Sequence, residues 1–143
     1  MATRIQVTFD AADPDKIARF WAEALGYVLE PPPAGYESWE EFLTALGMPR
    51  AEWSTGSAIV DPEGRRPRIY FQQVPEPKTA KNRVHLDLDP AGRGTPAHRR
   101  RALVDAEVER LIGAGATRLY HMVEYGQYHV TMADPEGNEF CVH

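Results

Sequence analysis

One stretch of strictly alternating residues constrains the fold of this chain more than any other feature. In residues 82–89, apolar side chains beginning with Val84 alternate with polar ones, which is the pattern of a β-strand with one buried face. A similar stretch, residues 5–10, lies near the amino terminus. Each is followed by a helical pattern and then by a β-rich run that reaches Asp-Pro-Glu-Gly, at 61–64 and again at 134–137. The chain therefore passes twice through one structural plan.

The first pass begins with a well-marked helix. Asp13 and Pro14 are typical of a helix start, because an aspartate caps free backbone amides and proline suits the first helical position. Apolar residues then recur at helical spacing as far as Gly26, where the helix is expected to end. A short strand is predicted at residues 27–30, before three consecutive prolines.

An insertion without a counterpart in the second pass follows these prolines. Ser38 and Glu41 form a capping box, so a helix is expected over about residues 38–47. Strands are then predicted at residues 53–61 and 68–74.

The second pass repeats the order of elements with a longer helix. This helix is expected from His98 to Ile112, closed by Gly113 and Gly115. The strands predicted after it are residues 117–123, 128–133 and 139–143. The whole chain is thus expected to be α+β, with two βαβββ modules in one domain of residues 1–143. The first module is predicted to span 1–77 and the second 78–143.

Composition narrows the class of protein. The 43% hydrophobic and 26% charged content is ordinary for a globular domain, and the net charge of −5 argues against nucleic-acid and acidic-membrane partners. The basic cluster at residues 98–101 is expected to be a solvated helix start. One cysteine cannot form an internal disulfide, and no apolar run approaches the roughly 20 residues that span a bilayer. A cytoplasmic location is therefore expected.

Strand alternation predicts a polar face that lines a cavity. Directed hydrogen-bonding groups beside aromatic area are what a small-molecule site needs, although such a face can also simply be wet. The residues expected to bind a ligand are Gln6, Thr8, Tyr70, Gln72, His85, Asp87, Tyr128 and Cys141.

His85 and Asp87 are the candidate catalytic pair on this face. An imidazole can exchange a proton near neutral pH, and Asp87 follows on the same face of the strand. The alternatives are a structural histidine bonded to a neighbouring strand and an aspartate paired with Arg83 or Arg68. Tyr128 is included as an aromatic residue that covers the cavity mouth.

Several short motifs, in this order, resemble the vicinal oxygen chelate superfamily, which includes glyoxalases, extradiol dioxygenases and bleomycin-resistance proteins. The chain looks like a glyoxalase-like domain over nearly its whole length. The residues that carry the resemblance are Ala12-Asp13-Pro14 with Phe20-Trp21, Asp61 to Gly64, Pro75 to Lys78, Lys81 to Leu88, and Asp134 to Cys141.

The resemblance implies two βαβββ modules that form a cupped mixed sheet, often in a homodimer. It also implies metal-ligand positions on the first and last strand of each module. Carried onto this chain, these positions are Gln6, Gln72, His85 and Cys141, of which only His85 matches the usual His, Glu, His and Glu. Neutral amides are poor ligands for hard divalent ions, so no functional metal cofactor is expected.

Three functions follow from these observations. The first is a protein that binds a small molecule without a catalytic metal. The second is a lyase, isomerase or dioxygenase that uses a weakly held metal or the pair of His85 and Asp87. The third is a non-catalytic interaction module whose partner contacts residues 98–101 or the inserted helix.

Overall fold

The computed structural model describes residues 1–143, which form two compact units, Met1–Pro77 and Lys78–His143. We refer to them as module one and module two. Each contains a four-stranded mixed sheet, so the predicted α+β class with a βαβββ plan is confirmed. No helix of the protein combines the length and the apolar character needed to cross a bilayer.

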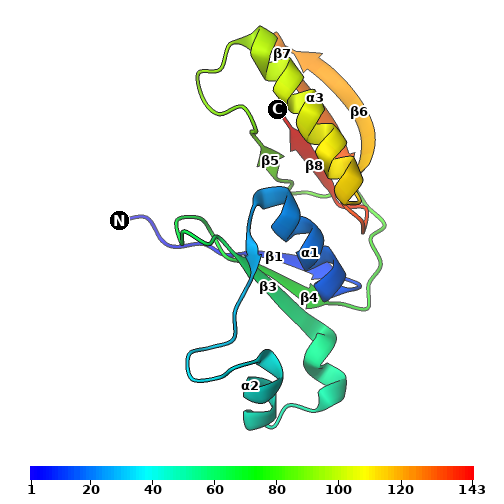
Figure 1. The fold of residues 1–143 in the computed structure, drawn as a ribbon. Coiled ribbons are helices and arrows are strands. Elements are labelled where there is room, and N and C mark those ends of the chain that lie inside the picture. Colours follow the sequence, from blue (N-terminus) through cyan, green and yellow to red (C-terminus); the bar gives the residue numbers. More distant parts are fainter. The chain divides into compact units, whose positions relative to one another are not determined.

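Module one has the sheet order β1-β4-β3-β2, with α1 against one face (Figure 1). The outer strand β1 pairs with β4 in parallel, and the other pairs are antiparallel. Its elements are β1 (Val7–Ala11), α1 (Pro14–Leu25), β2 (Val28–Leu29), α2 (Trp39–Ala45), the 3-10 helix η1 (Arg50–Thr55), β3 (Gly56–Val60) and β4 (Ile69–Gln73).

The ends of the two helices of module one are set by local chemistry, as predicted. The Asp13 carboxylate accepts a hydrogen bond from the Lys16 amide at 3.2 Å, and Gly26 ends α1 with a φ of 68°. Ser38 caps α2 by accepting from the Glu41 amide at 3.1 Å. The Glu41 carboxylate accepts in return from the amide of Glu37, one residue before the usual partner in a capping box.

The core of module one lies between α1 and the sheet. Ile17 and Trp21 on α1 and Phe71 on β4 are completely or almost completely buried. The Phe9 ring stacks on Phe71 with centroids 5.2 Å apart and lies 5.4 Å from the Trp21 ring. The face of the sheet predicted to be apolar is therefore the one that packs on the helix.

Module two has the equivalent sheet order β5-β8-β7-β6, with α3 against one face (Figure 1). The outer strand β5 again pairs with the last strand in parallel. Its elements are β5 (Asp87–Leu88), α3 (Ala97–Ala114), β6 (Thr117–Glu124), β7 (Gln127–Ala133) and β8 (Glu139–Val142). Val104, Val108 and Leu111 on α3 are fully buried against this sheet.

Three predicted boundaries were wrong. The strand predicted at residues 82–89 is reduced to Asp87–Leu88, and Val84 is 79% exposed, because the amide of Asn82 bonds to the Glu139 carboxylate instead of joining a strand ladder. Residues 50–55 form η1, not the start of a strand, since the Trp53 indole donates back to the Met48 carbonyl at 3.0 Å. Helix α3 runs two residues beyond the predicted Ile112, to Ala114, and is closed by Gly115, one of the two glycines predicted to close it, where φ is 119°.

Candidate functional site

The parallel pairing of β5 with β8 brings three chemically active side chains together in module two. Asp87 lies directly opposite Cys141 in the strand register, and the Cys141 amide donates to the carbonyl of Leu86 at 3.0 Å. His85, two residues before β5, lines the same hollow as both. One ligand atom from each of His85, Asp87 and Cys141 lies within 4.8 Å of the other two.

Asp87 is the centre of this group. Its carboxylate lies 3.2 Å from Nε2 of His85 and 4.0 Å from Nε2 of His143. Asp87 can therefore accept a proton from either imidazole or pair with a positive charge beside it. Cys141 is half-buried, and its sulfur lies 3.5 Å from the hydroxyl of the buried Thr131 on β7. The four side chains His85, Asp87, Cys141 and His143 are called the β5–β8 cluster below.

The β5–β8 cluster lies within a hollow of about 340 Å³ on the face of the sheet opposite α3. Polar side chains from β6 and β7 complete the hollow, which makes it suitable for a small molecule held by hydrogen bonds. Outside the cluster, the lining residues are Lys81, Tyr120, Glu124, Gln127, His129, Thr131 and Glu139.

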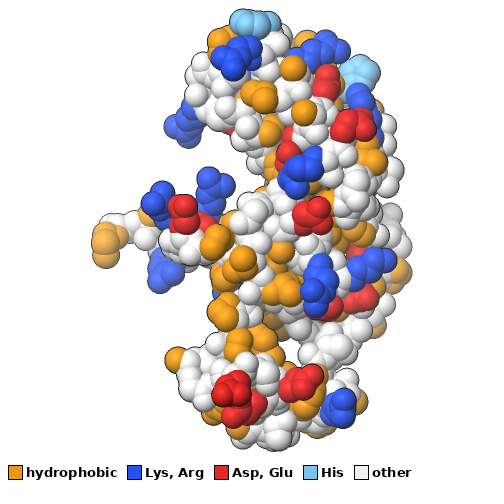
Figure 2. Space-filling view, in the orientation of Figure 1, with side chains coloured by type: hydrophobic (Ala, Val, Ile, Leu, Met, Phe, Trp, Pro, Cys, Tyr) orange, Lys and Arg blue, Asp and Glu red, His pale blue; other side chains and the backbone are white.

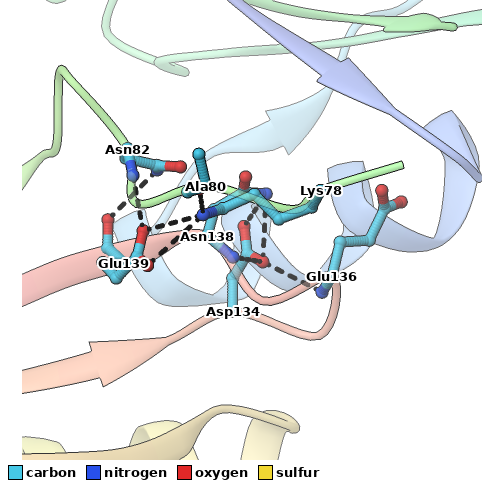
Figure 3. Close-up of polar contacts among 7 residues, drawn as sticks. All are labelled: Lys78, Ala80, Asn82, Asp134, Glu136, Asn138 and Glu139. Atoms are coloured by element: carbon cyan, nitrogen blue, oxygen red, sulfur yellow. Dashed lines mark hydrogen bonds and ion pairs between the residues drawn. The ribbon is translucent and has the colours of Figure 1, made fainter. Parts of the chain in front are cut away.

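The loop that precedes β5 is fixed to β8 by Glu139 (Figure 3). Its carboxylate accepts from the Asn82 amide at 2.9 Å and forms an ion pair with Lys78 at 3.2 Å, and Lys78 also donates to the carbonyl of Ala80. Burial raises the pKa of Glu139, but the hydrogen bonds from Asn82 and Lys78 outweigh it and hold the pKa below its usual value. The ionised Glu139 thus positions the segment that carries His85.

The Asp-Pro-Glu-Gly turn before β8 is also held by hydrogen bonds (Figure 3). Asp134 is only 3% exposed and accepts hydrogen bonds from the amides of Glu136 and Asn138, both at 2.9 Å. The Asn138 side chain donates to the same carboxylate. This turn fixes where β8 starts, and therefore which residues of β8 face the hollow.

Module one carries a different arrangement at the equivalent position. Gln6 lies against Arg68, whose guanidinium donates to Gln6 at 2.9 Å and makes a two-pronged ion pair with Glu30 at 2.6 and 2.8 Å. Gln72 lies further along β4 and donates to the Asp10 carboxylate at 2.8 Å. The structure therefore does not bring Gln6 and Gln72 together, because β1 and β4 are in a register that pairs Asp10 with Gln72.

The remaining predicted ligand-binding residues divide between the two faces of the sheets. Thr8 and Tyr70 lie opposite each other on β1 and β4, on the face away from α1. Tyr128 lies on the other face of its sheet: it is 8% exposed, and its hydroxyl donates to Asp105 of α3 at 2.6 Å. Burial and this bond raise the pKa of Tyr128. Tyr128 thus packs against the helix and does not line the hollow, so its predicted place over the cavity mouth was wrong.

Several residues of the hollow were missed from the sequence. Thr131 and His129 on β7 face the β5–β8 cluster, and strand alternation within residues 128–133 could have identified them. Arg68, not Gln72, could have been identified as the residue of module one that corresponds to Cys141. Arg68 and Cys141 each lie seven residues after the aspartate of an Asp-Pro-Glu-Gly motif. The partner of Arg68, Glu30, has no sequence signal, since 38 residues separate the two.

A family model described as "Glyoxalase-like domain" matches residues 6–143. No curated protein matches the chain. Among solved structures, a fosfomycin resistance protein, FosX, from Listeria monocytogenes is similar with a TM-score of 0.64 and 11% identity, covering 100% of this chain and 93% of its own. A mutant of FosX from the same organism, complexed with Mn(II) and 1S,2S-dihydroxypropylphosphonic acid, is similar with a TM-score of 0.62 and 12% identity, and the match covers 100% of this chain and 90% of that one.

A third similar structure is a glyoxalase/bleomycin resistance protein/dioxygenase family enzyme from Burkholderia phytofirmans. It has a TM-score of 0.60 and 18% identity, and the match covers 96% of this chain and 94% of that one. At these identities the likeness establishes the fold. The chemistry has to be argued from the side chains of this chain.

Proposed function

This chain belongs to the glyoxalase-like domain family, and from that premise we propose that it binds a small anionic molecule in the hollow of module two, next to a divalent transition-metal ion held by the β5–β8 cluster. The observation that carries the proposal is the convergence of His85, Asp87 and Cys141, whose ligand atoms lie within 4.8 Å of one another. The sequence alone led us to expect no metal, and this convergence does not support that expectation.

The charge of the hollow favours a cation at its base. The charged residues that line it are one lysine, Lys81, and three acids, Asp87, Glu124 and Glu139, of which Glu139 is already paired with Lys78. The remaining negative charge would repel an anionic ligand. A divalent ion beside Asp87 reverses the sign of the field and makes the hollow attractive to a carboxylate or a phosphonate.

The types of ligand atom indicate which ion fits. Imidazole, carboxylate and thiolate together are typical of zinc sites, whereas hard ions such as Mn²⁺ prefer oxygen and nitrogen ligands without sulfur. Cys141 therefore favours zinc at this position. A bound zinc ion would supply a Lewis acid that polarises an oxygen of the ligand.

The protein side chains around the cluster have separate roles in this proposal. Asp87 orients His85 through the 3.2 Å contact with Nε2, and Thr131 orients the Cys141 sulfur at 3.5 Å. Lys81 places a positive charge at the hollow for one end of an anion. A molecule of the size of a short-chain phosphonate or carboxylate would thus be bound at two points, the metal ion and Lys81.

The 3.2 Å contact of His85 with Asp87 also favours a second candidate function without a metal. A histidine beside a carboxylate can take a proton from a bound molecule and return it, as lyases and isomerases require. The two candidates differ in one respect, because treatment with a chelator removes ligand binding in the first and leaves it intact in the second.

A titration of the full chain with zinc, in competition with a chromophoric chelator, tests the first candidate. We expect one zinc per chain, with the affinity lowered by about a hundredfold or more in His85→Ala and Cys141→Ser, because even residues behind a metal ligand contribute about tenfold to a hundredfold. His98→Ala is the matched control, since His98 is exposed at the start of α3 and does not line the hollow.

A calorimetric titration of the zinc-loaded protein with methylphosphonate then tests whether the hollow binds a small anion. Binding only in the presence of zinc supports the metal-dependent proposal, and binding that survives chelation supports the second candidate. Zinc affinities that are equal in His85→Ala and His98→Ala would show that the β5–β8 cluster holds no ion.

A homodimer, which the family resemblance implies, is also part of the proposal. Strand β6 lies at the edge of its sheet, and an exposed apolar edge strand is a ready surface for a second chain. Sedimentation of the purified protein gives the oligomeric state directly. The exposed apolar side chains on β6 and the turn after it are Leu119, Tyr120, Met122, Val123 and Tyr125.

A further inference from the structure

Module one contains a second pocket, distinct from the hollow of module two. It has a volume of about 430 Å³ and lies between the inserted segment, residues 31–55, and strands β2, β3 and β4 of the sheet. We call it the insert pocket. Figure 1 shows the 3-10 helix leading into the start of β3, with α2 next to that helix. Its apolar and aromatic lining residues are Leu29, Trp39, Leu43, Met48, Trp53, Ala58 and Tyr70.

The two tryptophans offer flat apolar walls to the insert pocket. The Trp39 indole donates its hydrogen bond to the carbonyl of Glu30 at 2.7 Å, and the Trp53 indole donates to the carbonyl of Met48 at 3.0 Å. The polar edge of each indole is thus satisfied within the protein. The Arg50 guanidinium lies over the Trp53 ring, 5.7 Å from its centroid, and Phe42 lies edge-on to Trp39 with centroids 5.8 Å apart. The ring surface that remains for a ligand can bind aromatic groups and cations.

Gly56 makes room for a polar group in this pocket. A side chain at position 56 would collide with the Tyr70 hydroxyl, so glycine is needed for the observed position of that ring. The Arg68 guanidinium lies over the Tyr70 ring, with its carbon 5.4 Å from the ring centroid. Tyr70 also lines the pocket, so its hydroxyl can bond to a molecule bound there.

The charged side chains of the pocket leave one negative charge without a partner. Asp15 is paired with Arg19 at 2.9 Å, and Arg68 is neutralised by Glu30. Glu52 also lines the pocket, and its carboxylate makes no ion pair or hydrogen bond. A ligand in the insert pocket therefore meets aromatic walls and one unneutralised carboxylate.

The negative charge of module one around the pocket also favours a cationic ligand. Module one has 7 Lys and Arg against 12 Asp and Glu, whereas module two has 9 of each, so the net charge of −5 belongs to module one alone. Within residues 31–55 there are four glutamates and one arginine. Figure 2 shows acidic side chains gathered over the α2 region. Such a field attracts cations and repels anions on approach.

We propose that the insert pocket is a second ligand site, and that it binds a small aromatic molecule that carries one positive charge. The aromatic part lies against Trp39 and Trp53, the cationic group pairs with Glu52, and the Tyr70 hydroxyl bonds to a polar atom of the ligand. The site differs from the hollow of module two in the sign of the charge that it selects.

Three probes that share a naphthalene ring test this assignment: naphthylmethylamine, naphthalenemethanol and naphthoate. In calorimetric titrations of the full-length protein at low salt, we expect the cationic amine to bind most tightly, the neutral alcohol less tightly and the anionic naphthoate least. Glu52→Gln should weaken binding of the amine about fivefold, as expected for the loss of one partly exposed ion pair, and should leave binding of the alcohol unchanged. Trp53→Leu should weaken all three.

Glu76→Gln is the matched control, because it removes the same charge from module one at an exposed position that does not line the pocket. It should leave binding of all three probes as in the unchanged protein. Failure of every probe to bind would overturn the proposal. So would equal affinities for the amine and the naphthoate, or an equal effect of Glu52→Gln and Glu76→Gln on the amine.

Discussion

The two modules share one plan, but the residue seven positions after the aspartate of each Asp-Pro-Glu-Gly turn has opposite surroundings. In module one this residue is Arg68, whose guanidinium is held by Glu30 and Gln6. In module two it is Cys141, which lies beside His85 and Asp87 with no salt bridge of its own. At the same place in the fold, the side chain of module one is therefore held by an ion pair, whereas that of module two is available to bind a ligand.

This difference determines which of the two modules can hold a metal ion. A guanidinium cannot bind a metal ion, and its bonds to Glu30 also occupy the nearest carboxylate. The corresponding atoms of module two are an imidazole, a carboxylate and a thiol on one face of one sheet. Module one instead leaves its aromatic insert pocket for recognition. The predictions below separate these two roles.

The largest expected difference concerns the two Asp-Pro-Glu-Gly turns. Asp134 is buried and accepts bonds from two amides and one side-chain amide, so Asp134→Ala should lower the free energy of unfolding by about 2–3 kcal/mol by leaving buried donors unpaired. Asp61→Ala should lower it less, because the equivalent turn is more exposed and water can replace the carboxylate. Denaturant unfolding of the two variants measures both, and equal losses would contradict the comparison.

A smaller difference is expected at the position seven residues after each aspartate. Arg68→Gln breaks the ion pair with Glu30 and should lower the free energy of unfolding by about 1 kcal/mol, once screening by solvent is allowed for. Cys141→Ser keeps the size of the side chain and breaks no ion pair, so it should change stability less while it weakens zinc binding. Thermal unfolding without metal separates the two variants. A more destabilising Cys141→Ser would mean that this residue has a structural role.

The smallest expected effect is a dependence on pH in module two. The hydrogen bond from Arg100 lowers the pKa of Asp89 from its usual 3.8, so the stability that it contributes is present above that value and is lost as the pH falls through the lower pKa of the folded state. Asp89→Asn should reduce the acid-induced loss of stability by less than about 1 kcal/mol. Denaturant titrations between pH 6 and pH 2 follow this loss. An unchanged acid profile in the variant would contradict it.

Much of the fold could be predicted because its signals are local. The caps at Asp13 and Ser38 and the glycine at 26 act within one turn of their helices, and each is found where the sequence placed it. Alternation also predicted one apolar and one polar face for each sheet, and Phe71 and Phe140 are fully buried on the apolar faces. These features depend on neighbours within a few residues, which a single sequence contains.

What could not be predicted depends on contacts between distant residues. The register of β1 with β4 pairs residues 62 positions apart and decides that Gln6 meets Arg68 and not Gln72. Val84 follows the alternating pattern of a strand, yet the bond from Asn82 to Glu139 holds its segment as a loop. Tyr128 was expected over the cavity mouth, but its hydroxyl bonds to Asp105 of α3, which lies 23 positions away in the sequence. The candidate site is therefore half predicted. The strand pattern indicated His85, Asp87 and Cys141, whereas Lys81, Thr131 and His129 were not named, although alternation within residues 128–133 could have identified the last two.

The most direct test of the account follows the histidine side chains by NMR while zinc is added to the full-length protein. If the β5–β8 cluster holds the ion, the ring signals of His85 should move to a saturated value at one zinc per chain, and those of the exposed His98 should stay in place. His85→Ala should abolish the saturable step, and Gln72→Ala in module one should leave it unchanged. A step that persists in His85→Ala, or that disappears in Gln72→Ala, would contradict the assignment of the metal site to module two.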